Sequence, residues 1–137
     1  MDEQLKLLKG FHGHLGPYVT AGLRMGRFAL KRLQAKPHQG VEADVWCPAS
    51  PPASCIMDGI QVATGCTLGK HNLRHHVDDE MRVLFRNRHT NEVVMLGLRA
   101  EAIQRAMAIL EEQSDTAASE FVANMPEGEL LEELRGD

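Results

Sequence analysis

The feature that most constrains this chain is the segment from Cys55 to Asn72, CIMDGIQVATGCTLGKHN. Its first part, residues 55–64, is predicted to form a helix, with Ser54 as its N-cap and Gly65 at its end. A polar, glycine-containing loop follows. Two of the three cysteines of the chain therefore stand at opposite ends of one predicted helix.

The spacing of these two cysteines limits the metal sites that they can form. Cys66 follows Cys55 by eleven positions, and eleven residues of continuous helix advance about 16 Å. Two thiolates on one tetrahedral zinc ion lie within about 4 Å of each other. Either the two thiols serve different sites, or a dimer brings Cys66 of one chain to Cys55 of the other.

Composition excludes several function classes. A chain of 137 residues with 43% hydrophobic and 25% charged residues is expected to be one soluble globular domain over residues 1–137. Its net charge of -4 and 4% aromatic content argue against nucleic-acid binding. We find neither a secretory signal nor an apolar run long enough for a membrane span. An odd number of cysteines fits free thiols or ligands in a reducing compartment, so a cytoplasmic protein is expected.

The hydrophobic patterns predict an α+β fold, with a small, mainly antiparallel sheet packed with several helices. Small residues at Ala21, Gly22 and Gly26 leave one side of the second helix slim, so that another helix or a second subunit can approach it. The predicted helices are residues 3–9, 17–34, 55–64, 100–113, 116–124 and 127–134, which makes residues 100–135 helical at the C-terminus. The predicted strands are residues 41–47, 73–79, 81–86 and 93–98.

His12 and His14 are the first candidate metal ligands. Gly13 between them gives the backbone freedom to aim both imidazoles at one point, and imidazole is a common transition-metal ligand. Cys55 at a helix start, where the dipole favours a thiolate, is predicted to be a third ligand or a nucleophile. Asp58 lies one turn later and would act as an acid/base group or orient a ligand. The alternatives are a solvated turn for the histidines and an inert buried cysteine.

The loop after Cys66 has the composition of a site for a small anion or cofactor. Thr67, Lys70 and Asn72 are its candidate binding residues, and Cys66 is a second candidate nucleophile. The loop is not a phosphate-binding P-loop, because the first glycine of that motif is missing and a helix rather than a strand precedes it.

Two segments resemble the FmdE-like family, a domain family of formylmethanofuran dehydrogenase operons. The first is FHGHLGP at residues 11–17, and the second is CIMDGIQVATGCTLGKHN. The resemblance covers about residues 4–98. Two departures are the glycine at Gly16, where relatives carry a cysteine, and the lack of a C-terminal cysteine-rich zinc module. The resemblance implies an α+β fold, a bound metal and a dimer, and it implies these more firmly than any reaction.

We therefore predict a homodimeric metal- or cofactor-binding accessory or carrier protein of a redox or one-carbon pathway, acting beside an enzyme of that pathway. The metal is a transition metal ion, zinc in the first place, with iron or nickel as alternatives. Two other functions stay open. One is a thiol enzyme of the sulfur-transfer type that uses Cys55 or Cys66, and the other is a metal-free binder of a small anion.

Overall fold

A computed structural model describes residues 2–135. Within these residues, six α-helices and a five-stranded sheet confirm the predicted α+β class. Among the helices described, none combines the length and apolar character that a membrane crossing requires. The elements follow in the order α1 (Glu3–His12), α2 (Pro17–Leu33), β1 (Val41–Cys47), α3 (Ile56–Thr64), β2 (Leu73–Val77), β3 (Arg82–Asn87), β4 (Val93–Leu98), α4 (Ala100–Glu112), α5 (Asp115–Asn124), α6 (Glu127–Leu130) and β5 (Leu131–Leu134), with short 3₁₀ helices η1 (His38–Gly40) and η2 (Ala53–Cys55).

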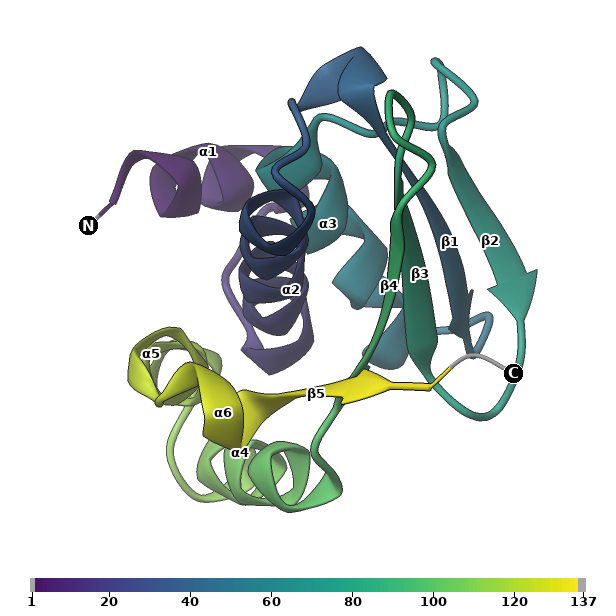
Figure 1. Ribbon diagram of the computed structural model, residues 1–137. Coiled ribbons are helices and arrows are strands. Elements are labelled where there is room, and N and C mark those ends of the chain that lie inside the picture. The colour runs from purple at the N-terminus through teal and green to yellow at the C-terminus, as the bar shows by residue number, and fades with distance from the viewer. Residues whose placement is uncertain (1, 136–137) are drawn as a thin grey trace.

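The described strands are ordered β2-β1-β3-β4-β5, and among their pairings only that of β1 with β2 is parallel. Residues of β1 alternate between the two faces of the sheet, as strand geometry requires. Its apolar members are fully buried, and the residues between them are partly exposed. Figure 1 shows α1, α2 and α3 on one side of the sheet, with α4, α5 and α6 beyond its β5 end. The other face of β1 carries Glu42, Asp44 and Trp46.

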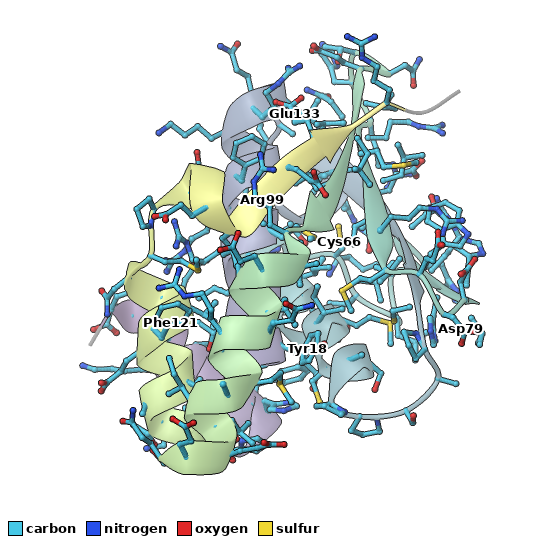
Figure 2. The ribbon with its side chains drawn as sticks, turned by 90° about the horizontal axis from the view of Figure 1, so that it is seen from below. Tyr18, Cys66, Asp79, Arg99, Phe121 and Glu133 are labelled. Atoms are coloured by element: carbon cyan, nitrogen blue, oxygen red, sulfur yellow. The ribbon has the colours of Figure 1, made fainter. Side chains whose placement is uncertain are left out.

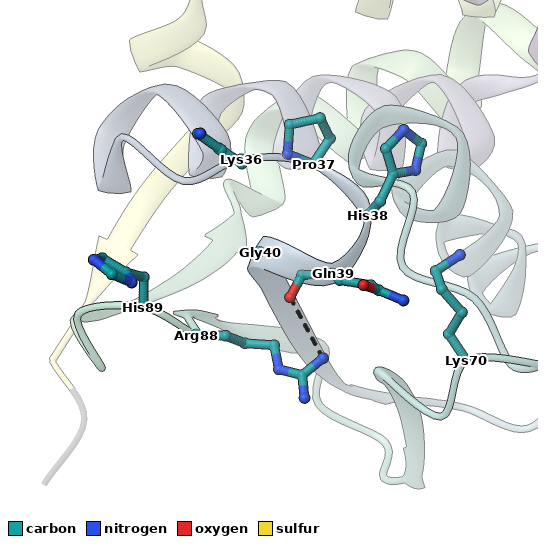
Figure 3. Close-up of a pocket in the computed structure, with 8 residues that line it drawn as sticks. All are labelled: Lys36, Pro37, His38, Gln39, Gly40, Lys70, Arg88 and His89. Atoms are coloured by element: carbon teal, nitrogen blue, oxygen red, sulfur yellow. Dashed lines mark hydrogen bonds between the residues drawn. The ribbon is translucent and has the colours of Figure 1, made fainter.

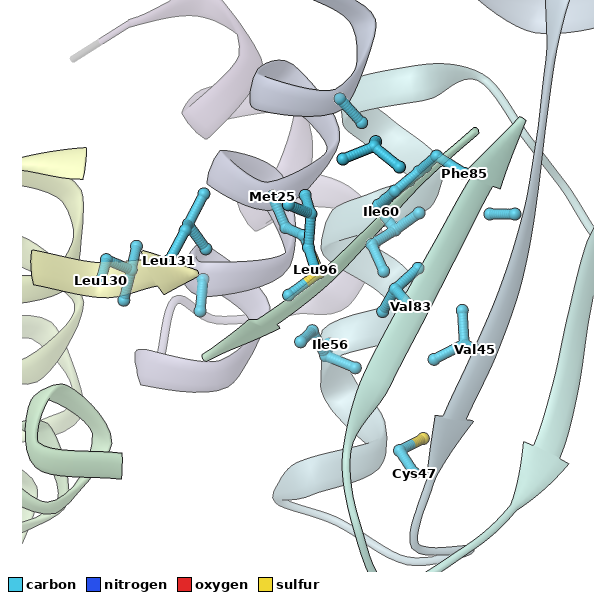
Figure 4. Packing of buried hydrophobic residues seen from close by; sticks show 14 of the residues in the cluster. Met25, Val45, Cys47, Ile56, Ile60, Val83, Phe85, Leu96, Leu130 and Leu131 are labelled. Atoms are coloured by element: carbon cyan, nitrogen blue, oxygen red, sulfur yellow. The ribbon is translucent and has the colours of Figure 1, made fainter. Parts of the chain in front are cut away.

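The core lies between α2, α3 and the buried face of the sheet. Ile56 and Ile60 of α3 and Met25 of α2 are fully buried against strand residues such as Phe85 and Leu96 (Figure 4). These side chains remove apolar surface from water, which is the main favourable term in folding.

Glycines let α2 and α3 cross closely. A Cβ atom on Gly22 would overlap the carbonyl oxygen of Ile56, and one on Gly59 would overlap that of Val19. A Cβ on Gly26 would lie 2.6 Å from the Cβ of Ala63. The slim side of α2 is therefore used by α3, not by a second subunit.

Three local predictions were wrong. Helix α1 does not end at Gly10 but continues to His12, because Gly13 adopts a left-handed conformation (φ 104°) and caps it. Ser54 makes no capping hydrogen bond, since η2 leads directly into α3 with Cys55 at the N-cap. The predicted helix over residues 127–134 is helical only to Leu130, and β5 then pairs with β4.

Candidate functional site

The two motif segments meet through a hydrogen bond between His12 and Asp58. The Nδ1–H of His12 donates to Asp58 Oδ2 over 2.6 Å, although the residues are 46 positions apart. His12 closes the last turn of α1, and Asp58 lies in the first turn of α3. The His12 side chain is only 11% exposed, whereas that of Asp58 is 35% exposed. Because Nδ1 faces the carboxylate, the Nε2 atom of His12 is left free to bind a ligand.

His14 lies beside His12 and has a carboxylate of its own. The two ring centroids are 4.9 Å apart, and Nδ1 of His14 is 3.7 Å from Asp115 Oδ2. Asp115 is the first residue of α5. Sequence reasoning missed it, because only the tertiary packing of α5 brings it here. Each histidine of the motif thus faces an aspartate through its Nδ1 atom.

Gly16 borders the same group. A Cβ atom built on it would lie 3.5 Å from Asp115 Oδ1 and 3.6 Å from a ring carbon of His14, both ordinary contact distances. Its backbone is extended (φ -133°), a conformation that any residue adopts. A side chain therefore fits at this position, where the family that the sequence resembles carries a cysteine.

Cys55 does not join the histidines in a three-ligand cluster. Burial raises the pKa of its thiol, and the Asp58 carboxylate raises that pKa further. The thiolate expected from the helix start is therefore disfavoured. Among residues 2–135, no three histidine, cysteine or acidic side chains converge to hold a metal ion. The predicted site of His12, His14 and Cys55 is thus not assembled in this conformation.

Cys66 is sealed inside the core. It is 0% exposed, its thiol donates to the carbonyl oxygen of Val41 (3.4 Å), and burial raises the pKa of the thiol. Figure 2 places Cys66 towards the interior of the molecule, whereas Asp79 lies at the periphery. A thiol in this position can neither attack a substrate nor reach a second chain. The burial of Cys66 argues against both expectations, nucleophile and ligand across a dimer, which stay predictions.

The loop after Cys66 divides into a structural part and an exposed part. Asn72 is 2% exposed, and its amide donates to the carbonyl oxygens of His38 and Val41 while its Oδ1 accepts from the N–H of Thr67. Its hydrogen-bonding capacity is used within the fold, so it is not available to a cofactor. Lys70 is exposed, and its Nζ donates to Thr67 Oγ1 over 3.1 Å.

A cavity of about 690 Å³ lies next to His14, between α1, α2 and α5. Apolar side chains line part of it, and a buried hydroxyl pair, Thr20 with Ser119 at 2.7 Å, lies in its wall. This volume is within the range of about 300–1,000 Å³ that small-molecule sites occupy. Its further lining residues include Leu5, Leu15, Leu23, Arg24, Arg27 and Asp115.

Comparison with known proteins decides the family. The profile described as FmdE, molybdenum formylmethanofuran dehydrogenase operon, matches residues 11–132. The chain belongs to the FmdE family. The description of this family refers to the operon of a molybdenum formylmethanofuran dehydrogenase.

Two individual proteins resemble this FmdE chain. The crystal structure of a tungsten formylmethanofuran dehydrogenase FmdE-like protein from Syntrophus aciditrophicus has a TM-score of 0.67 at 25% identity, covering 98% of this chain and 72% of that chain. A probable S-adenosyl-L-methionine-binding protein of Archaeoglobus fulgidus is 40% identical over 72 residues. That match covers 47% of this chain but only 18% of the relative, so the chain spans less than a fifth of that protein.

Proposed function

We propose that this FmdE-family chain is a metal-binding accessory protein in which His12 and His14 bind one transition metal ion. One observation carries the proposal: two neighbouring imidazoles each turn Nδ1 towards an aspartate, in a 2.6 Å hydrogen bond for His12 with Asp58 and at an ion-pair distance of 3.7 Å for His14 with Asp115. Carboxylates that hold the second nitrogen of a metal-binding histidine fix its tautomer and orientation. The free Nε2 atoms are then the ligands.

The ring separation fits a shared ion. With zinc–nitrogen bonds of about 2.0–2.1 Å and tetrahedral angles, two imidazole centroids lie about 5 Å apart. The observed separation is 4.9 Å. Two imidazoles fill half of a tetrahedral shell, so Cys55, solvent or a second copy of the chain would supply the rest. Such a half-filled site suits zinc first, with iron or nickel as alternatives.

Metal content tests the proposal most simply. Protein prepared without a histidine tag and equilibrated with zinc is expected to hold one ion per site by elemental analysis. His12→Ala is expected to lose it, and Asp58→Asn to weaken binding by about tenfold to a hundredfold. The matched control His89→Ala removes a histidine in the hairpin between β3 and β4 and is expected to leave the metal content unchanged.

A gain of binding provides a second test. Gly16→Cys places a thiol beside His14 and is expected to tighten zinc binding by about tenfold or more, since thiolate is a strong zinc ligand. Gly16→Ser adds a side chain of nearly the same size without the thiol and serves as the control. Wild-type protein that binds no metal, or a His12→Ala protein that keeps it, would contradict the proposal.

The cavity beside His14 supports a second candidate function, the binding of a small organic molecule such as S-adenosyl-L-methionine. Its volume and mixed lining suit such a ligand, and the Archaeoglobus relative carries that ligand in its name. Calorimetry with S-adenosyl-L-methionine tests it. Ala123→Phe narrows the cavity and is expected to abolish binding, whereas Ala108→Phe, on the exposed side of α4, is the control. An absence of heat with the wild-type protein would dismiss this candidate.

A further inference from the structure

A second site lies near the opposite end of α3, where three loops enclose a shallow hollow of about 570 Å³ (Figure 3). We call it the basic hollow. Three permanent cations and two histidines line it, and none of its lining residues in the described part of the chain is acidic. The whole chain carries a net charge of -4, so the positive charge of the hollow is opposite in sign to the net charge of the protein. Its lining residues are Lys36, Pro37, His38, Gln39, Gly40, Lys70, Arg88 and His89.

Hydrogen bonds fix the three loops relative to one another. The N–H of Arg88 donates to the carbonyl oxygen of Gly40 over 2.9 Å, which ties the β3–β4 hairpin to η1. Asn72 Nδ2 donates to the carbonyl oxygen of His38 over 2.8 Å, which ties the Lys70 loop to the same segment. The ring of His38 also packs directly over Gly65, where a Cβ atom would overlap it. The backbone of the hollow is thus preorganised, so that a ligand orders only side chains when it binds.

The cations of the hollow are not neutralised by nearby acids. Arg88 lies 3.8 Å from Glu42, but Glu42 is shared with Arg74 and Arg86, each at 3.5 Å. Arg74 is also paired with Asp44 at 2.8 Å, so Glu42 is shared mainly between Arg86 and Arg88. Lys70 makes its hydrogen bond to a neutral hydroxyl, and within residues 2–135 neither Lys36 nor Lys70 is paired with an acid. The hollow has a net positive field.

We infer that the basic hollow binds a small molecule through two or more oxyanion groups, with Arg88 and Lys70 as its principal contacts. A guanidinium binds a phosphate or carboxylate through two parallel N–H bonds, and an ammonium adds a point charge. Figure 3 shows the Arg88 side chain reaching from the hairpin to the carbonyl oxygen of Gln39, to which its Nη1 donates over 3.4 Å, with Lys70 on the other side of Gln39. A nucleic acid is not the expected ligand, because the described lining includes no aromatic ring of Phe, Tyr or Trp on which bases could stack.

Calorimetry with inorganic pyrophosphate, at low salt and on protein depleted of metal by dialysis, tests the inference. The double variant Lys70→Gln, Arg88→Gln is expected to raise the Kd by at least about tenfold, which corresponds to about 1.4 kcal/mol. The matched control Lys6→Gln, Arg105→Gln removes the same charge from α1 and α4 and is expected to leave the Kd within about twofold. Citrate, titrated in parallel, distinguishes a carboxylate ligand from a phosphate ligand at the same residues.

Four results would overturn the inference. These are no binding of either anion by the wild-type protein at millimolar concentration, equal binding by the hollow variant, equal weakening in the control, and tighter binding of a single-stranded oligonucleotide than of pyrophosphate. Thermal unfolding of each variant confirms that it folds. His12→Ala is expected to bind pyrophosphate like the wild-type protein, so the outcome is independent of the metal site proposed above.

Discussion

The two ends of α3 look alike in sequence and differ completely in the structure. Each end has a cysteine with polar neighbours. At the first end, Cys55 is partly exposed, and Asp58 one turn later reaches His12. At the second end, Cys66 is 0% exposed and donates to the backbone of β1. The chemistry at the second end instead belongs to the exposed cations around the basic hollow.

This difference shows that the position of a cysteine on a helix does not decide its chemistry. The helices and strands that pack against each end of the helix decide whether the thiol is exposed. Helix α2 packs against the Cys55 end at Ile56, and α1 reaches it through His12, yet Cys55 and Asp58 both remain partly exposed to solvent. The Cys66 end is closed by β1 and by the amide of Asn72, which satisfies the backbone of the loop.

The largest expected effect is on thiol accessibility. Under native conditions, iodoacetamide is expected to modify Cys55 at least about a thousandfold faster than Cys66, because Cys66 reacts only when the core opens and native domains are stable by about 5–15 kcal/mol. Peptide mapping by mass spectrometry assigns the modified residue. Comparable rates at the two cysteines would break the comparison between the ends.

The second effect concerns the glycines at which α2 and α3 pack closely, Gly22, Gly26 and Gly59. Gly59→Ala forces a Cβ atom into the Val19 carbonyl and to 2.6 Å from the Leu23 nitrogen. We expect a loss of about 3 kcal/mol in the free energy of unfolding, measured by urea denaturation. Gly10→Ala is the matched control, because it lies in α1 with nothing within 4 Å of its Cβ position. That variant is expected to gain about 0.5–1 kcal/mol.

The third effect compares the two thiols as structural groups. Cys66→Ser buries a more polar hydroxyl in the core and is expected to reduce the free energy of unfolding by about 1–2 kcal/mol. Cys55→Ser, at a partly exposed position, is expected to change it by less than about 0.5 kcal/mol. Urea denaturation of both variants measures the difference. Equal losses of unfolding free energy would show that Cys66 is no more buried than Cys55.

The smallest expected effect concerns the electrostatics at the Cys55 end of α3. Burial is the main cause of the raised pKa of Cys55, and the Asp58 carboxylate, which Asp58→Asn removes, is the second cause. The pKa of that thiol falls, so a larger fraction is thiolate at a given pH below it. Alkylation of metal-free protein at pH about 8 is expected to become roughly threefold faster. Measuring the rate against pH identifies the cause, because the gain should vanish at high pH, where the thiol is ionised in both proteins.

Much of the fold follows from local sequence signals. The alternation in VEADVWC gave the bounds of β1, and Pro17 marked the start of α2. The strand β5 could not be predicted in this way. The residues Leu131–Leu134 are Leu-Glu-Glu-Leu, which favour a helix locally, and they become a strand because the edge of β4 offers backbone partners.

The candidate site divides in the same manner. The sequence pointed to His12, His14 and Asp58, because their spacing and residue types carry the chemistry. The role of Asp115 could not be predicted from the sequence, because an aspartate early in a helix is ordinarily explained by the helix dipole alone. The burial of Cys66 and the structural use of Asn72 likewise depend on β1 and η1, which are distant in sequence.

Cobalt binding tests the central difference between the two ends of α3 most directly. Cobalt(II) bound by a thiolate gives a charge-transfer absorption band that histidine ligands alone do not give. We expect metal binding to draw Cys55 to the two histidines, so that the band appears in wild-type protein and in Cys66→Ser and is lost in Cys55→Ser and His12→Ala. A band that disappears in Cys66→Ser but survives in Cys55→Ser would contradict this account.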